Sequence, residues 1–150
     1  MNGKAVKVAP ITKKGYARIN REWKKRDKVE LVLPMPPERI EAHPFARQDC
    51  GRIALQRGPV VYCLEEADNG LSLNDIVLPR AARLAVKTAK PLGGIPVIVA
   101  SGKRRSLEGW RDKLYRPAGS KMQAVTLKAI PYFMWGNRQL GEMLVWIGEA

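Results

Sequence analysis

The stretch Arg52–Glu66, "RIALQRGPVVYCLEE", contains two runs of strand-forming residues separated by an Arg-Gly-Pro corner. β-branched and aromatic residues favour strands, and a Gly-Pro pair favours a sharp turn. The stretch therefore predicts two strands joined by a tight connection. It also ends with a cysteine and two acids, which raises a second interpretation in which the corner is a catalytic device.

The spacing of these reactive residues favours the structural interpretation. Neighbouring residues on a strand point to opposite faces, so Glu65 and Glu66 are not expected to converge on one bond. A nucleophilic thiol needs a nearby cation, metal or helix N-terminus to lower its pKa. Cys63 lies between Tyr62 and Leu64 in a predicted strand, and we expect it to be a buried, unreactive thiol.

Period-two alternation continues on both sides of this stretch. Val29, Leu31 and Leu33 alternate with polar residues in "KVELVLP", which predicts a half-buried strand. We expect this strand to pair as a hairpin with residues 15–23 across the "KKRD" turn. Further strands are predicted at residues 84–89, 95–100 (apolar enough to be buried on both faces), 122–130 and 142–148.

Together these segments predict an all-β fold, an antiparallel β-sandwich. Only residues 106–116 show helical spacing, and that segment is short enough to be a turn or a loop. The proline cluster near residue 35 suggests a division into residues 1–45 and 46–150. The first part offers only a hairpin and a Pro-rich linker, so it is predicted to be the remnant of a preceding sandwich, and the second part to be a sandwich of its own.

Composition narrows the function classes. The net charge of +13 raises the possibility of nucleic-acid binding, but the basic residues are spread along the chain, which argues against that partner. The runs at 21–28 and 102–106 are expected to be solvated loops. No apolar run approaches the length of a membrane span, and no signal peptide is visible, which predicts a cytoplasmic protein without a membrane partner. Cys50 and Cys63 are expected to be buried free thiols rather than a disulfide.

Two phrases carry a family resemblance: Arg-Gly-Pro-x-Val-Tyr-Cys-x-Glu at residues 57–65 and Pro-Tyr-x-x-Trp-x-Asn-Arg at residues 131–138. The stretches at residues 15–36 and 92–98 agree with them. In this order the four stretches resemble the C-terminal end of glycoside hydrolase family 127, the β-L-arabinofuranosidase-like enzymes. The resemblance covers nearly the whole chain and is weakest across residues 100–121.

The resemblance implies a catalytic helical barrel followed by two β-sandwich modules. It also implies a zinc-bound cysteine thiolate as nucleophile and a glutamate as acid/base, with zinc held by a Glu-x-Cys motif and a Cys-Cys pair in the barrel. This sequence contains neither motif, so no catalytic, metal-binding or cofactor-binding residue can be carried over, and zinc is expected only for the catalytic domain of the parent. The chain is expected to begin within the first sandwich, as a truncated frame would, and to be inactive alone.

One position in the first part of the chain departs from the family pattern. Arg26 stands where the family usually has glycine, which implies a different turn, or strain if its φ is positive.

The predicted function is a non-catalytic region that supports the barrel or an oligomer. An alternative is an independent carbohydrate-binding module. A sugar platform or domain interface is predicted at Tyr132, Trp135, Asn137 and Arg138, unless Trp135 packs in the core while Arg138 pairs with an acid or caps a turn.

Overall fold

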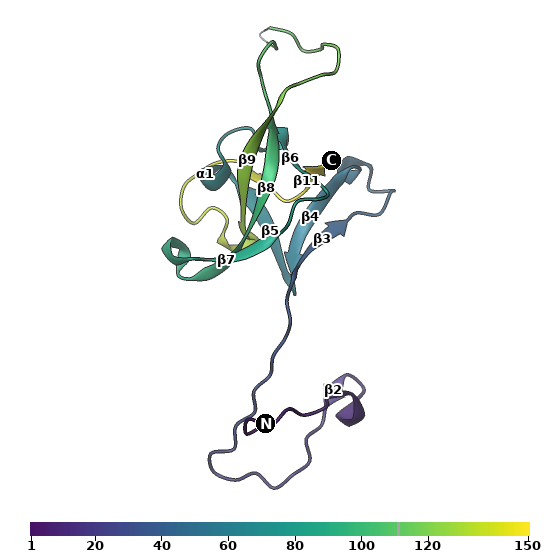
Figure 1. Ribbon diagram of the computed structural model, residues 1–150, viewed down its shortest axis with the longest axis vertical. Helices are drawn as coiled ribbons and strands as arrows, with labels where there is room; N and C mark the ends of the chain where they lie inside the picture. Colours follow the sequence, from purple (N-terminus) through teal and green to yellow (C-terminus); the bar gives the residue numbers. More distant parts are fainter. Residues whose placement is uncertain (111) are drawn as a thin grey trace. The chain divides into compact units, whose positions relative to one another are not determined.

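The computed structural model describes residues 1–110 and 112–150 and divides the chain into two compact units, Met1–Pro34 and Met35–Ala150 (Figure 1). The boundary lies ahead of the division predicted at residue 45, because β3 (Pro37–Glu41) pairs with β4 (Arg52–Arg57) in the second unit. Pro37 begins β3, an edge strand, where a residue without an N–H is tolerated. None of the described helices is long and apolar enough to cross a membrane.

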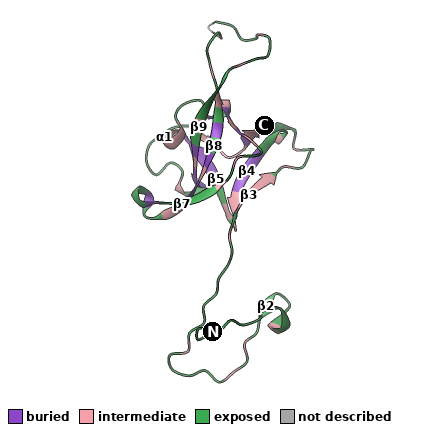
Figure 2. Ribbon diagram, in the orientation of Figure 1, coloured by how far each residue is buried: buried purple, intermediate pink, exposed green. Residues whose placement is uncertain are grey.

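The unit Met1–Pro34 contains one small hairpin, in which β1 (Thr12–Lys13) pairs with β2 (Tyr16–Ala17). Lys14 and Gly15 both have positive φ, at 53° and 81°, as a two-residue hairpin turn of the primed type requires. The 3-10 helix η1 (Ala9–Ile11) precedes it. Every residue of this unit is described, and none is buried (Figure 2).

The hairpin predicted for residues 15–23 and 28–34 was wrong. Residues 18–34, all of which the structure describes, contain no strand, and Val29, Leu31 and Leu33 are 52%, 73% and 64% exposed. The "KKRD" turn does form, with the Asp27 N–H donating to the Lys24 carbonyl at 3.0 Å. Arg26 in this turn has φ +77°, so of the two possibilities weighed for it, a strained residue in the left-handed region is the one observed. An alternating segment without a partner sheet cannot bury its apolar face, so the strand does not form.

The unit Met35–Ala150 is built from β3 to β11. The remaining strands are β5 (Val60–Glu65), β6 (Ile76–Leu78), β7 (Ala85–Ala89), β8 (Ile95–Arg105), β9 (Met122–Pro131), β10 (Met143–Leu144) and β11 (Ile147–Glu149). Among the described residues, only the pairing of β6 with β11 is parallel. The all-β, mainly antiparallel class predicted from the sequence is confirmed.

The strand pairings close on themselves. They run β4–β5–β9–β8–β6–β11 and return to β4, so the two edges of the sheet are joined. β3, β7 and β10 add to this ring at its outside. A closed arrangement leaves few exposed edges for aggregation. The β4–β5 corner predicted from the sequence is a tight turn in which Gly58 has φ +57°.

Two apolar clusters take alternate residues of the strands and so lie on opposite faces of them. The larger takes alternate residues from each strand of the ring, as period-two packing requires: Ile53 and Leu55, Tyr62 and Leu64, Ile76 and Leu78, Ile98 and Ala100, Leu127 and Ala129, and Ile147. The smaller takes the intervening residues Cys63, Val97 and Ile130 with Ala89 and Leu92. β5, β8 and β9 are therefore covered on both sides, as predicted for residues 95–100.

Three expectations need correction in this unit. The strand predicted at 142–148 is interrupted at residues 145–146, because β10 pairs with β5 whereas β11 pairs with β4 and β6. The basic run at 102–106 largely continues β8 rather than forming a loop. Cys50 is exposed, not buried, and both cysteines are free. The segment 106–116 forms turns where it is described, and Arg111 lies outside the described residues.

Candidate functional site

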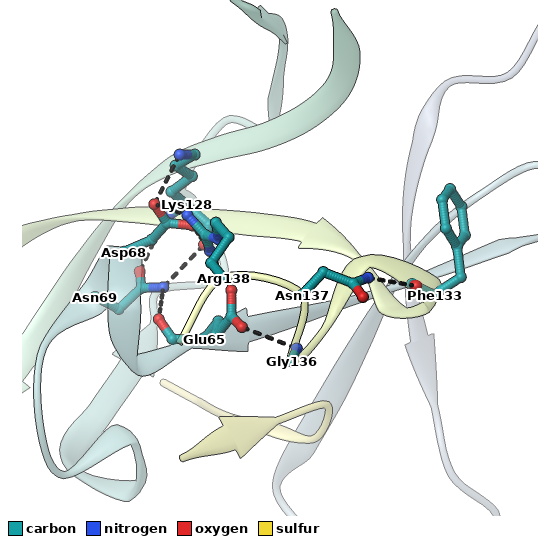
Figure 3. A network of polar contacts seen from close by, with 8 residues as sticks. All are labelled: Glu65, Asp68, Asn69, Lys128, Phe133, Gly136, Asn137 and Arg138. Atoms are coloured by element: carbon teal, nitrogen blue, oxygen red, sulfur yellow. Dashed lines mark hydrogen bonds and ion pairs between the residues drawn. The ribbon is translucent and has the colours of Figure 1, made fainter. Parts of the chain in front are cut away.

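Polar residues gather where β5 ends and the four-residue helix α1 (Glu66–Asn69) begins. Asn69 fastens this helix to β9. Its amide nitrogen donates to the carbonyls of Glu65 and Lys128, both at 2.9 Å, and its amide oxygen accepts from the Lys128 N–H at 3.0 Å. The loop that follows the 3-10 helix η5 (Tyr132–Met134) passes beside α1, so side chains distant in the sequence meet here (Figure 3).

Glu65 places a carboxylate inside this junction, since the residue is only 1% exposed. One oxygen accepts from the Gly136 N–H at 3.1 Å, and the other accepts from the Arg138 guanidinium. Burying a carboxylate is costly unless it is paired and hydrogen-bonded. Here both conditions are met by the loop after η5, which is thereby attached to the end of β5.

Arg138 joins Glu65 to a second acid. Its two terminal nitrogens donate to the two carboxylate oxygens of Asp68, at 3.0 Å and 2.6 Å, which is the parallel fork that guanidinium groups form with carboxylates (Figure 3). Lys128 of β9 donates to the same Asp68 carboxylate at 2.7 Å. Two anions and two cations therefore compose a neutral cluster.

The pKa shifts of this cluster follow from its contacts. Burial alone would raise the pKa of Asp68, but hydrogen bonds from Arg138 and Lys128 outweigh burial and lower it below the ordinary value. The Asp68 and Glu65 carboxylates raise the pKa of Arg138 further above its already high value. Asp68 and Arg138 are thus held in their charged forms, and neither is poised to exchange a proton near neutral pH.

The structure brings the four predicted platform residues onto η5 and the loop that follows it. Tyr132 and Trp135 are 46% and 44% exposed, with ring centroids 6.3 Å apart and planes tilted by 32°. The Asn137 side chain donates to the Phe133 carbonyl at 3.4 Å. Arg138 pairs with acids, which is the alternative weighed for it from the sequence, whereas Trp135 is half exposed rather than a core residue.

The reactive residues of the opening stretch do not come together. Burial and the nearby Glu65 carboxylate raise the pKa of the Cys63 thiol to about 11, which favours the unreactive thiol form. Glu66 accepts instead from the Glu142 N–H at 2.8 Å. Within the described part of the chain, no group of three metal-ligating side chains lies close enough together to hold an ion.

Sequence reasoning missed Asp68, Asn69 and Lys128. Asp68 and Asn69 belong to "EEADNG", whose composition is typical of a polar loop. Lys128 lies on the polar side of an alternating strand, where a solvent-exposed side chain is expected. Their roles depend on α1 lying against β9 and the loop after η5, and local patterns do not encode that contact. The one usable signal was Arg138 itself, for which an acid partner was weighed from the sequence.

Comparison with known proteins now identifies the two units. Residues 37–148 match the glycoside hydrolase family 127 C-terminal domain, and residues 1–35 match the β-L-arabinofuranosidase GH127 middle domain. A non-reducing end β-L-arabinofuranosidase from Bifidobacterium longum subsp. longum is 33% identical over an alignment of 124 residues, and the match covers 78% of this chain and 19% of that protein.

Solved structures agree with these matches. The crystal structure of a GH127 β-L-arabinofuranosidase from Geobacillus stearothermophilus T6 is 48% identical and superposes with a TM-score of 0.88, covering 99% of this chain and 24% of the other. A second GH127 β-arabinofuranosidase is 34% identical, with a TM-score of 0.82 over 99% of this chain and 22% of the other. The chain thus spans about a fifth to a quarter of the length of these relatives. The resemblance found in the sequence is confirmed, and the chain belongs to glycoside hydrolase family 127, comprising its C-terminal domain and part of its middle domain.

Proposed function

We propose that this chain is a non-catalytic β-domain region of a family 127 glycoside hydrolase, and that it serves by supporting the catalytic part of such an enzyme. The observation that carries the proposal is the state of its reactive side chains. Glu65 and Asp68 are neutralised by Arg138 and Lys128, and the thiol of Cys63 is buried with a raised pKa. The two acids are engaged in ion pairs and the thiol is in its unreactive form, so none of these three side chains is available for chemistry.

The parent activity that we propose is hydrolysis of arabinofuranoside-type linkages, as the names of the relatives indicate. In that setting the cluster around Arg138 attaches the loop after η5 rigidly to the body of the domain. A rigid loop with exposed aromatic side chains suits contact with a second protein surface, because aromatic side chains dominate the energetics of protein interfaces. The partner that we propose is the catalytic domain, with self-association as the rival.

The test is an activity assay of the purified chain on a chromogenic arabinofuranoside, with zinc and reductant present. We expect no turnover above buffer, whereas the relative from Geobacillus stearothermophilus T6 serves as positive control. Turnover that is lost in Cys63→Ser or Glu65→Gln would overturn the proposal. In a second experiment the chain is added to a family 127 enzyme from which the matching region has been deleted. We expect the activity to recover, and we expect the Arg138→Met chain to restore less of it.

A second candidate function is favoured by one observation, the exposed pair Tyr132 and Trp135. Aromatic rings can stack on the apolar faces of sugars, so this pair would form a carbohydrate-binding platform. It predicts saturable binding of arabinan-like oligosaccharides that Trp135→Ala abolishes without unfolding the chain. A flat titration of the wild-type chain would eliminate this candidate and leave the supporting role untouched.

A further inference from the structure

A hollow lies at the far end of the β8–β9 hairpin, away from the cluster around Arg138. Its volume is about 380 Å³, and its floor is formed by Arg105 and Met122, which are opposite each other at the last pairing of the two strands. Trp110 and residues 116–120 of the connecting loop form its walls. Pockets of this volume are at the lower end of the range that holds small molecules.

A stacked pair of side chains shapes the walls of the hollow. The Arg116 guanidinium lies over the Trp110 ring, 4.6 Å from its centroid. Arg116 also donates to the Glu108 carbonyl and to the Ser120 hydroxyl, both at 2.8 Å. One guanidinium therefore contacts three points of the loop, at Trp110, Glu108 and Ser120, and stabilises its conformation.

The polar side chains that line the hollow are mainly donors, and in the described part of the chain only the Arg116 guanidinium already has acceptors, within the loop itself. The Trp110 indole nitrogen is buried and has no hydrogen-bond partner among the described residues. Arg105 forms no ion pair with any residue that the structure describes, although Arg104 beside it is bonded to the carbonyls of Asn69 and Leu71. The described lining contains two arginines and no acid. A buried N–H without an acceptor is unfavourable, so the hollow is suited to a ligand that supplies acceptors and negative charge.

From this arrangement we infer that the hollow binds a carboxylate-bearing sugar, a uronic acid. The planar guanidinium of Arg105 matches a carboxylate by two parallel bonds, and a small shift of the loop would let the buried Trp110 N–H donate to a ring or hydroxyl oxygen. Pro117, Ala118 and Met122 offer apolar contact for the C–H face of a sugar ring. The choice of a sugar acid over another carboxylate rests on the proposed function, because the family acts on carbohydrates; the choice of an anion rests on the hollow alone.

The experiment is a calorimetric titration of the chain at constant ionic strength with three probes: digalacturonate, the matching neutral galactobiose, and inorganic phosphate. Digalacturonate is expected to bind saturably and at least about tenfold more tightly than either other probe, as one charge-assisted, bidentate contact implies. Arg105→Gln is expected to weaken digalacturonate about tenfold, and Arg105→Lys by less, because a lysine keeps the charge but not the fork. Trp110→Phe, which keeps a ring and removes the N–H, is expected to weaken it several-fold.

The matched control is Lys87→Gln, which removes one exposed positive charge from β7 and should leave binding unchanged. Thermal unfolding of each variant shows whether it is folded before it is titrated. Equal binding of digalacturonate and galactobiose, equal or tighter binding of phosphate, or unchanged affinity in Arg105→Gln would each overturn the inference. A flat titration would overturn it too, while the inactivity of the chain on arabinofuranosides would remain, so the two proposals fail separately.

Discussion

The Arg138 guanidinium and the Asp68 carboxylate, seventy residues apart in the chain, meet through two parallel hydrogen bonds of 3.0 Å and 2.6 Å. The same guanidinium also pairs with the buried Glu65 carboxylate. One side chain therefore joins the loop after η5 to both β5 and α1. The cluster is neutral only while Arg138 is present.

Replacing Arg138 by methionine is expected to lower the free energy of unfolding by about 3 kcal/mol, since removing one partner leaves the other charge buried and uncompensated. Arg138→Lys keeps the charge and should cost less, because it loses only the fork. Urea unfolding followed by circular dichroism measures both changes. A decrease in the free energy of unfolding of less than about 0.5 kcal/mol, the range of ordinary surface substitutions, would show that the cluster does not stabilise the fold.

The lowered pKa of Asp68 makes stability depend on pH in a defined direction. The folded state binds a proton at Asp68 less readily than the unfolded state does, so Asp68 contributes its full stabilisation above the ordinary carboxyl pKa of 3.8. That contribution is lost as the pH falls below this value toward the lowered pKa. Urea midpoints between pH 7 and pH 2.5 should fall more steeply for the wild type than for Asp68→Asn. Parallel curves would contradict the assignment.

How far the sequence predicted this molecule depends on whether an element has its partners within the chain. The alternation in β9 and the corner between β4 and β5 predicted those strands correctly, because the covering residues are present in the same unit. The equally clear alternation at Val29, Leu31 and Leu33 failed, because nothing in its own unit covers it. Likewise Arg138 was picked out from the sequence, but Asp68 was not, because their contact depends on tertiary packing.

Gly102 of β8 lies against the Leu127 side chain of β9, with no room for a Cβ between them. A methyl group at this position would lie 2.6 Å from the Leu127 side chain, below any normal contact. Gly102→Ala is therefore expected to cost about 1–3 kcal/mol, as other overpacked core positions do. Leu127 is buried in the larger apolar cluster and has little room to move.

Two further variants separate this clash from a general effect on β8. Ser101→Ala, at the exposed neighbouring position, should change stability by less than about 0.5 kcal/mol. Combining Gly102→Ala with Leu127→Val should cost less than the two single changes added together, because the smaller side chain relieves the contact. Strict additivity in urea unfolding would show that the clash does not govern the stability of Gly102→Ala.

The two thiols should differ sharply in reactivity. Cys50 is exposed, whereas Cys63 is fully buried and its pKa is raised to about 11. Because the thiolate is the reactive form, native protein at pH 8 is expected to take up one equivalent of iodoacetamide, and unfolded protein two. Cys50→Ser should abolish labelling of the native chain, and intact-mass spectrometry counts the adducts. Rapid labelling of Cys63 in the native Cys50→Ser chain would mean that this thiol is accessible and activated, and it would restore the catalytic interpretation of the Arg-Gly-Pro corner.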